Sequence, residues 1–329
     1  MNLKARNKYL PTLSDVFDSI WLADWATIVY STFTAVVLLF FWCQSESPWD
    51  ILFTRLGIVA VVFLLIYIYM VWPNKWTRIL RIAFPLAMLG VWYPDTFEFA
   101  RHLPNLDHVF ATADLKFFGC EPAYEMSRWL DGVVWSELFN AGYFAYYLMI
   151  ALGALVPLIW RDEETLRTLF IVVAGFYAYY IIYLFLPVAG PQFYFAVIDP
   201  SLIAHGPFPA LGDFFNLNPD SAVIGNTSEG FFQSLVAAAQ EGGERPVAAF
   251  PSSHVGMSTI LMFLFWRLKR GVFFTMLPLY LLLCGATVYI GAHYLIDVFA
   301  GWCTAIIFFY VLDKLYIKLA PRDEKNNPL

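Results

Sequence analysis

The feature that most constrains this chain is a succession of apolar stretches, most of them about as long as a bilayer is thick. A helix needs about 20 apolar residues to cross a hydrocarbon core of roughly 30 Å. Only 14% of the residues are charged and 60% are hydrophobic, whereas soluble domains carry about a quarter charged residues. We therefore expect an all-α, polytopic transmembrane helical bundle of about eight spans. Their expected ranges are 25–43, 51–72, 79–93, 137–160, 165–186, 252–266, 272–290 and 294–315.

The basic residues predict the orientation of these spans. With eight spans, the even-numbered connections and the two ends of the chain fall on one side of the membrane. That side holds 15 of the 20 basic residues: Lys4, Arg6, Lys8, Lys75, Arg78, Arg81, Arg161, Arg167, Arg267, Lys269, Arg270, Lys314, Lys318, Arg322 and Lys325. Cytoplasmic loops carry an excess of Lys and Arg. The sequence therefore predicts that both termini are cytoplasmic.

The same pattern suggests an organisation in four parts. Residues 1–24 form an N-terminal segment whose apolar residues recur at helical spacing, which fits an interfacial helix or equally packing against the bundle. Residues 25–136 form accessory transmembrane helices and an outer loop. Residues 137–319 form a catalytic-type transmembrane core with a long outer loop at 187–251, and residues 320–329 form a C-terminal tail. Outer connections of this length are usually functional or disordered, and we expect a partly helical lid.

Two of the five histidines stand where apolar spans begin. His254 lies in "FPSSH" at the outer start of one span, and His293 lies in "HYLID" at the outer start of another. The topology places both on the same membrane face at the same depth. Asp297 follows His293 at i, i+4, a spacing that shares one helix face. An intramembrane carboxylate is expensive without a partner, so we expect Asp297 to hold one ring nitrogen of His293 and leave the other free to react.

The segments "PSSHVGMS" and "VYIGAHYLIDVFAG" resemble the second and third signature motifs of the phosphatidic acid phosphatase type 2 superfamily, written PSGH and SRxxxxxHxxxD. The resemblance covers roughly the last 45% of the chain. It implies a helical catalytic core and a covalent mechanism. In that mechanism His293 attacks phosphorus, Asp297 orients it, and His254 protonates the leaving oxygen.

The sequence departs from the family pattern at the positions of three phosphate-binding cations. The arginine of the third motif falls on Thr287, and the first motif, KxxxxxxRP, aligns its lysine and arginine with Tyr179 and Leu186. A divergent branch of the superfamily that includes inositol phosphorylceramide synthase is similar in retaining mainly the two histidines and the aspartate. The phosphate charge would then be met by backbone N–H groups and by substrate-binding side chains, for which the candidates are Ser252, Ser253, Gln192 and Arg245.

These observations predict an integral-membrane lipid phosphotransferase or phosphatase that acts at the extracytoplasmic face. Its partners would be a membrane phospholipid or sphingolipid and, for a transferase, a lipid alcohol acceptor, with no nucleic acid. No metal ligand set or cofactor motif is present in the sequence. The alternative is a catalytically degenerate protein that binds or transports lipids or serves as a subunit of a membrane complex.

Overall fold

The computed structural model of the chain describes residues 11–220, 230–241 and 245–320, and the described residues contain helices and no strand. The prediction of an all-α bundle is confirmed for these residues. The helices are α1 (Leu13–Asp18), α2 (Leu22–Phe41), α3 (Pro48–Val71), α4 (Lys75–Ala100), α5 (Asp107–Phe118), α6 (Pro122–Trp129), α7 (Val133–Trp160), a 3₁₀ turn η2 (Asp162–Glu164), α8 (Thr165–Phe185), α9 (Pro191–Val197), α10 (Pro200–Ile203), α11 (Phe214–Leu217), α12 (Phe231–Glu241), α13 (Ser253–Leu268), α14 (Arg270–Tyr289) and α15 (Leu295–Leu319).

Six of the described helical segments are long and apolar enough to cross a membrane. They are Leu22–Phe41, Pro48–Val71, Val133–Trp160, Asp162–Phe185, Arg270–Tyr289 and Leu295–Leu319. The other two expected spans fall in α4 and α13. Helix α4 is continuous through Pro85 and Pro94 but is the least apolar of the long helices, and α13 has only 16 residues. The count of about eight spans therefore stays a prediction, as does the side on which the termini lie.

Helix α1 is only partly buried. Val16 and the following Ile20 are buried against Val62 and Ile66 of α3, whereas Leu13 at the start of the helix is exposed. This segment therefore packs against the bundle with some of its apolar residues and exposes others. Residues 1–10 of the predicted N-terminal segment, and residues 321–329 of the predicted tail, lie outside the described residues.

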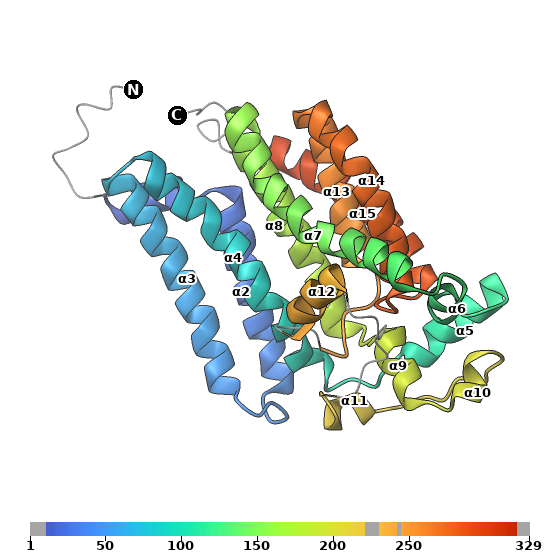
Figure 1. The fold of residues 1–329 in the computed structure, drawn as a ribbon. Helices are drawn as coiled ribbons and strands as arrows, with labels where there is room; N and C mark the ends of the chain where they lie inside the picture. Colours follow the sequence, from blue (N-terminus) through green and yellow to red (C-terminus); the bar gives the residue numbers. More distant parts are fainter. Residues whose placement is uncertain (1–10, 221–229, 242–244, 321–329) are drawn as a thin grey trace.

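Ion pairs join the segments that the sequence assigns to the basic side. Arg78 at the start of α4 pairs with Asp162 in η2 at 2.7 Å. At the end of α15, Asp313 pairs with Arg167 of α8 at 2.8 Å and with Arg267 of α13 at 2.7 Å. These contacts bring the start of α4, the turn between α7 and α8, and the ends of α13 and α15 to the same end of the bundle, which is the upper end in Figure 1.

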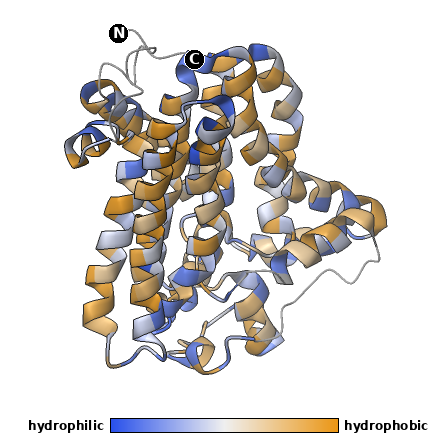
Figure 2. Cartoon of the chain, turned by 90° about the vertical axis from the view of Figure 1, so that its left-hand side faces the viewer, coloured by the Kyte–Doolittle hydropathy of each residue, from blue (hydrophilic) through white to orange (hydrophobic). Residues whose placement is uncertain are grey.

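Helix α13 forms the centre of the second half of the bundle and packs against α7, α8, α14 and α15. Its buried residues include Met257, Ile260, Leu261, Leu264 and Phe265, all within the largest apolar core. Figure 2 shows that hydrophobic residues dominate the long helices, while hydrophilic residues gather towards their ends. Short helices α5, α6 and α9–α11 collect at the lower end in Figure 1. This end is opposite the ion pairs described above.

Candidate active site

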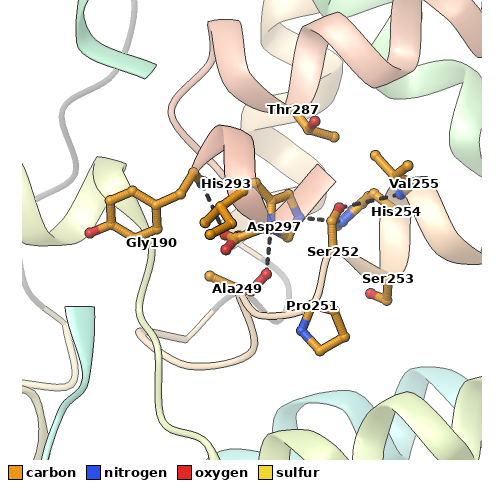
Figure 3. Close-up of polar contacts among 12 residues, drawn as sticks. Gly190, Ala249, Pro251, Ser252, Ser253, His254, Val255, Thr287, His293 and Asp297 are labelled. Atoms are coloured by element: carbon orange, nitrogen blue, oxygen red, sulfur yellow. Dashed lines mark hydrogen bonds and ion pairs between the residues drawn. The ribbon is translucent and has the colours of Figure 1, made fainter. Parts of the chain in front are cut away.

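The two predicted histidines lie together at this lower end. His254 is in the first turn of α13, and His293 is in the short connection between α14 and α15. The Nε2 atom of His293 is 3.3 Å from the Nδ1 atom of His254 (Figure 3). The His254 ring packs against the rings of Tyr143 and Tyr146 of α7, with centroids 4.7 and 4.5 Å away. Aromatic rings therefore fix the position of His254, and no described contact joins it to a carboxylate.

The orientation of His293 is set mainly by the backbone. Its Nδ1 atom is 2.7 Å from the carbonyl oxygen of Ala249 and 3.6 Å from Oδ2 of Asp297. With the Nδ1–H donated to this carbonyl, Nε2 carries the free electron pair. Burial lowers the pKa of His293 to about 4, so the ring is uncharged at neutral pH. A neutral imidazole with an available Nε2 is a nucleophile.

The hydrogen bond that His293 was expected to donate to Asp297 is therefore replaced by one that it donates to the Ala249 carbonyl. The reason is that α15 begins at Leu295, so His293 precedes the helix and does not share a helix face with Asp297. Asp297 lies at ion-pair distance from the ring. Its Oδ2 accepts a hydrogen bond from the Tyr294 N–H at 2.9 Å, and its buried Oδ1 has no hydrogen-bond partner among the described residues.

Ser252 and Ser253 shape the start of α13. The Ser252 hydroxyl caps the helix by accepting from the Val255 N–H at 3.3 Å, and the Ser252 N–H donates to the Asp297 carbonyl at 3.1 Å. The Ser253 N–H donates to the Tyr183 hydroxyl at 3.0 Å. Three N–H groups at this helix start, those of Ser252, Ser253 and Val255, thus have protein acceptors. Fewer N–H groups at this helix start are therefore left to bind a phosphate than the sequence suggests.

The two other predicted substrate-binding residues have different surroundings. Gln192 is buried, and its N–H donates to the carbonyl of Gly291 at 2.7 Å, two residues before His293. Arg245 is 45% exposed and pairs with Asp220 at 2.9 Å. No described contact joins Arg245 to the histidines. The structure therefore places Gln192 beside the site and Arg245 in a separate surface ion pair.

The positions of the three absent cations have structural contacts. The Tyr179 hydroxyl is 2.8 Å from the Thr304 hydroxyl of α15. The Thr287 hydroxyl donates to the Cys284 carbonyl at 2.9 Å, and the Thr287 carbonyl accepts from the His293 N–H at 3.0 Å. Leu186 is the C-cap residue that follows α8. Among the described residues, no Lys or Arg contacts the two histidines or Asp297.

Two carboxylates that the sequence analysis missed organise the site. Asp114 of α5 accepts hydrogen bonds from the N–H groups of Leu295 and Ile296 at 2.7 and 2.9 Å. It therefore caps the start of α15, where a negative charge is favoured by the helix dipole. Burial raises the pKa of Asp114 to about 6, against the lowering effect of these two hydrogen bonds.

Asp107 plays the same part for the connection after α8. Its two oxygens accept from the N–H groups of Ala189 and Gly190 at 2.7 and 2.8 Å and from the Tyr294 hydroxyl at 2.9 Å. Asp107 and Asp114 are seven residues apart and thus share a face of α5. That spacing, in a helix with few other charges on the same face, is the signal that could have pointed to them.

Gly190 allows the connection after α8 to approach His293. Its φ angle is +97°, and a Cβ atom there would lie 2.6 Å from the carbonyl oxygen of Ala292. Only glycine fits both this left-handed conformation and this separation. The close approach of the segment "VAGPQ" to the residue before His293 therefore depends on Gly190.

Comparison with known families agrees with the resemblance of the two histidine motifs. The profile of the PAP2 superfamily matches residues 109–311. The chain belongs to this superfamily. The matched region runs from α5 into α15 and contains Asp114, His254, His293 and Asp297. No curated protein and no solved structure matches the chain.

Proposed function

We propose that the protein is an integral-membrane lipid phosphotransferase or phosphatase that passes a phosphorus group through His293. Membership of the PAP2 superfamily and the six span-like segments support a membrane phosphatase-type function. The observation that carries the specific role is the position of His293 Nε2, which is 3.3 Å from His254 while Nδ1 is held by the Ala249 carbonyl. The lone pair of His293 Nε2 accepts the Nδ1–H of His254 in this arrangement, and the substrate phosphorus would take the place of that proton.

The reaction would proceed in two displacements. His293 Nε2 attacks the phosphorus of a lipid phosphoester, the P–O bond to the leaving alcohol breaks, and that oxygen takes a proton from the imidazolium form of His254, which becomes neutral. A second alcohol, or water, then gives its proton to His254 as its oxygen attacks phosphorus and the P–N bond breaks. The Ala249 carbonyl and the charge of Asp297, 3.6 Å away, stabilise the ring while Nε2 is bonded to phosphorus.

The electrostatics favour a phosphodiester over a phosphomonoester. No described cation contacts the histidines, and the carboxylates of Asp107, Asp114 and Asp297 lie close by. A phosphodiester carries one negative charge and a monoester nearly two, so the diester is repelled less by this arrangement. The substrate would be a phospholipid or sphingolipid, and a ceramide- or diacylglycerol-type alcohol would be the acceptor, as in the inositol phosphorylceramide synthase-like branch.

The phosphate would be bound by Gln192 and the two serines at the start of α13. Gln192 is the best placed of the proposed ligands because its own N–H already contacts the His293 connection. Arg245 would have to exchange Asp220 for the phosphate. No metal or cofactor is needed for this chemistry.

The proposed topology has eight spans, with α4 and α13 crossing the membrane beside the six segments named above. Both termini would then be cytoplasmic and the histidine pair extracytoplasmic. The ion-paired basic end of the bundle, opposite the histidines, supports this orientation by the excess of Lys and Arg expected in cytoplasmic loops. Residues 25–136 would form the accessory part, and residues 137–319 most of the core. Asp107 and Asp114 are contributed to the core from the accessory part.

The test is product analysis in lipid nanodiscs. Labelled phosphatidylinositol or phosphatidic acid is supplied with or without ceramide or diacylglycerol, and wild type is compared with His293→Ala. A new phospholipid that His293→Ala fails to make indicates a transferase, and free phosphate lost in the variant indicates a phosphatase. His205→Ala, at an exposed loop histidine, is the matched control and should retain activity. Equal product from wild type and His293→Ala on every lipid would contradict the proposal and favour the lipid-binding alternative.

A further inference from the structure

A third carboxyl group near the site differs from Asp107 and Asp114 in having no partner. Glu121 follows Asp114 by seven residues and stands immediately before α6. Its residue exposure is 1%, and neither carboxyl oxygen has a hydrogen-bond partner among the described residues. Asp107 and Asp114, by contrast, use both of their oxygens to hold backbone N–H groups.

Glu121 lies near Asp114 and near Tyr294, the residue that follows His293. Ala123, two residues further on, packs in one buried cluster with Val255 and Val298. These residues directly follow His254 and Asp297 in the sequence. Burial and then the charge of the nearby Asp114 raise the pKa of Glu121 to about 9. The start of α6 thus brings a protonated carboxyl group close to Asp114, which caps the start of α15.

The neighbouring phenols do not satisfy this carboxyl group. The Tyr294 hydroxyl donates to Asp107 at 2.9 Å, and the Tyr194 hydroxyl donates to the Pro209 carbonyl at 2.7 Å. A buried polar group without a partner is destabilising relative to an apolar residue of the same shape. An apolar side chain at position 121 would therefore stabilise the described fold more than Glu121 does.

The chemistry of the group defines what it can bind. A protonated carboxyl offers one O–H donor and one carbonyl acceptor, which matches an alcohol hydroxyl. A phosphate oxygen would be repelled by the neighbouring Asp114 charge. The group is thus suited to the neutral, hydroxyl-bearing part of a substrate.

We propose that Glu121 binds a hydroxyl group of the alcohol that leaves, or of the alcohol that enters, in the reaction at His293. This inference rests on the proposed function and adds to it a binding subsite for the alcohol, formed by Glu121. In a two-displacement reaction both alcohols use the same side of the phosphorus, opposite the P–N bond. One hydroxyl-binding residue can therefore serve the departing headgroup and the acceptor.

The experiment separates the two half-reactions. Wild type, Glu121→Leu and Glu121→Gln are mixed with a labelled phospholipid, and formation of the label on His293 and its transfer to an added alcohol or to water are followed separately. We expect Glu121→Leu to slow one alcohol-dependent half-reaction by about tenfold or more. Glu121→Gln, which keeps a donor and an acceptor, should retain most of the activity. Slower labelling indicates the departing alcohol, and slower transfer to alcohol with normal labelling indicates the entering one.

Thermal unfolding provides the structural control. Glu121→Leu should melt at the temperature of wild type or above, because it removes an unpartnered buried carboxyl group. The matched variant Glu125→Gln, on the less buried face of α6, should leave both half-reactions unchanged. Unchanged half-reactions in Glu121→Leu, or a lowered melting temperature, would overturn the inference alone. Absence of any label on wild-type His293 would overturn the proposed function as well.

Discussion

Buried carboxylates have different partners in the accessory helices and around the histidine pair. In the accessory helices, Asp24 and Asp95 each pair with an arginine, Arg81 and Arg55 respectively. Around the histidines, Asp107 and Asp114 are held by backbone N–H groups, and oxygens of Glu121 and Asp297 have no partner among the described residues. The buried carboxylates of the accessory helices are thus neutralised by arginines, whereas those around the histidines are held by N–H groups or keep an oxygen without a partner among the described residues.

The largest effect on stability is expected from breaking a charge pair in the accessory part. Arg81→Met would leave Asp24 buried without its cation, at a cost of about 3–5 kcal/mol. Activity per folded molecule should not change, because this pair lies at the opposite end from the histidines. Thermal unfolding in detergent, together with turnover normalised to folded protein, measures both.

The double variant Arg81→Met/Asp24→Leu is the control for this prediction. Because it removes both charges, it should recover most of the lost stability. If Arg81→Met abolished turnover in the remaining folded protein, the division between a structural and a chemical region would be wrong.

A smaller loss of stability and a clearer loss of activity are expected from Asp114→Asn. The asparagine can accept from only one of the two N–H groups at the start of α15, so about 1.5–3 kcal/mol is lost with the second charged hydrogen bond. The start of α15 also positions Asp297 beside His293, so kcat should fall as well. Asp18→Asn, at an exposed position, provides the control. Unaltered kcat in Asp114→Asn would show that the cap does not position the site.

The smallest effect concerns pH. An ordinary histidine gains its proton near pH 6.5, but burial lowers the pKa of His293 to about 4. The lowered pKa means that the ring remains uncharged, and therefore nucleophilic, as the pH falls from 7 to about 5. We expect kcat/KM to lose no activity through protonation of His293 in this range. A decline in kcat/KM with a midpoint near 6.5 that is also present in Asp114→Asn would contradict this expectation and would place the His293 ring in a more solvated environment.

Much of this arrangement was predictable from the sequence because it depends on side-chain pattern. The lengths of the apolar stretches predict the helices, and the motifs around His254 and His293 predict that the two rings meet. The Ala249 carbonyl could not be predicted, since a backbone acceptor leaves no mark on residue type. Asp114 was missed for a related reason: its partners are the N–H groups of Leu295 and Ile296, far away in the chain.

One predicted span, in α13, is not among the six segments that are long and apolar enough to cross a membrane. Helix α13 is too short to meet the length of a span by itself, yet it is the most enclosed helix of the second half of the bundle, with α7, α8, α14 and α15 around it. Packing against protein substitutes for contact with lipid there. Burial alone does not explain the difference, because the segment Asp162–Phe185 is also largely buried and yet is long and apolar enough to cross a membrane.

The most direct test of the central claim is to capture the covalent intermediate. Wild-type protein in nanodiscs is mixed with a phospholipid labelled in its phosphate, denatured within milliseconds to seconds under alkaline conditions that preserve phosphohistidine, and mapped by mass spectrometry. The account predicts a phosphorus adduct on His293 that forms and decays at rates compatible with turnover and is absent from His293→Ala. Turnover without any adduct on His293, or an adduct on another residue, would contradict it.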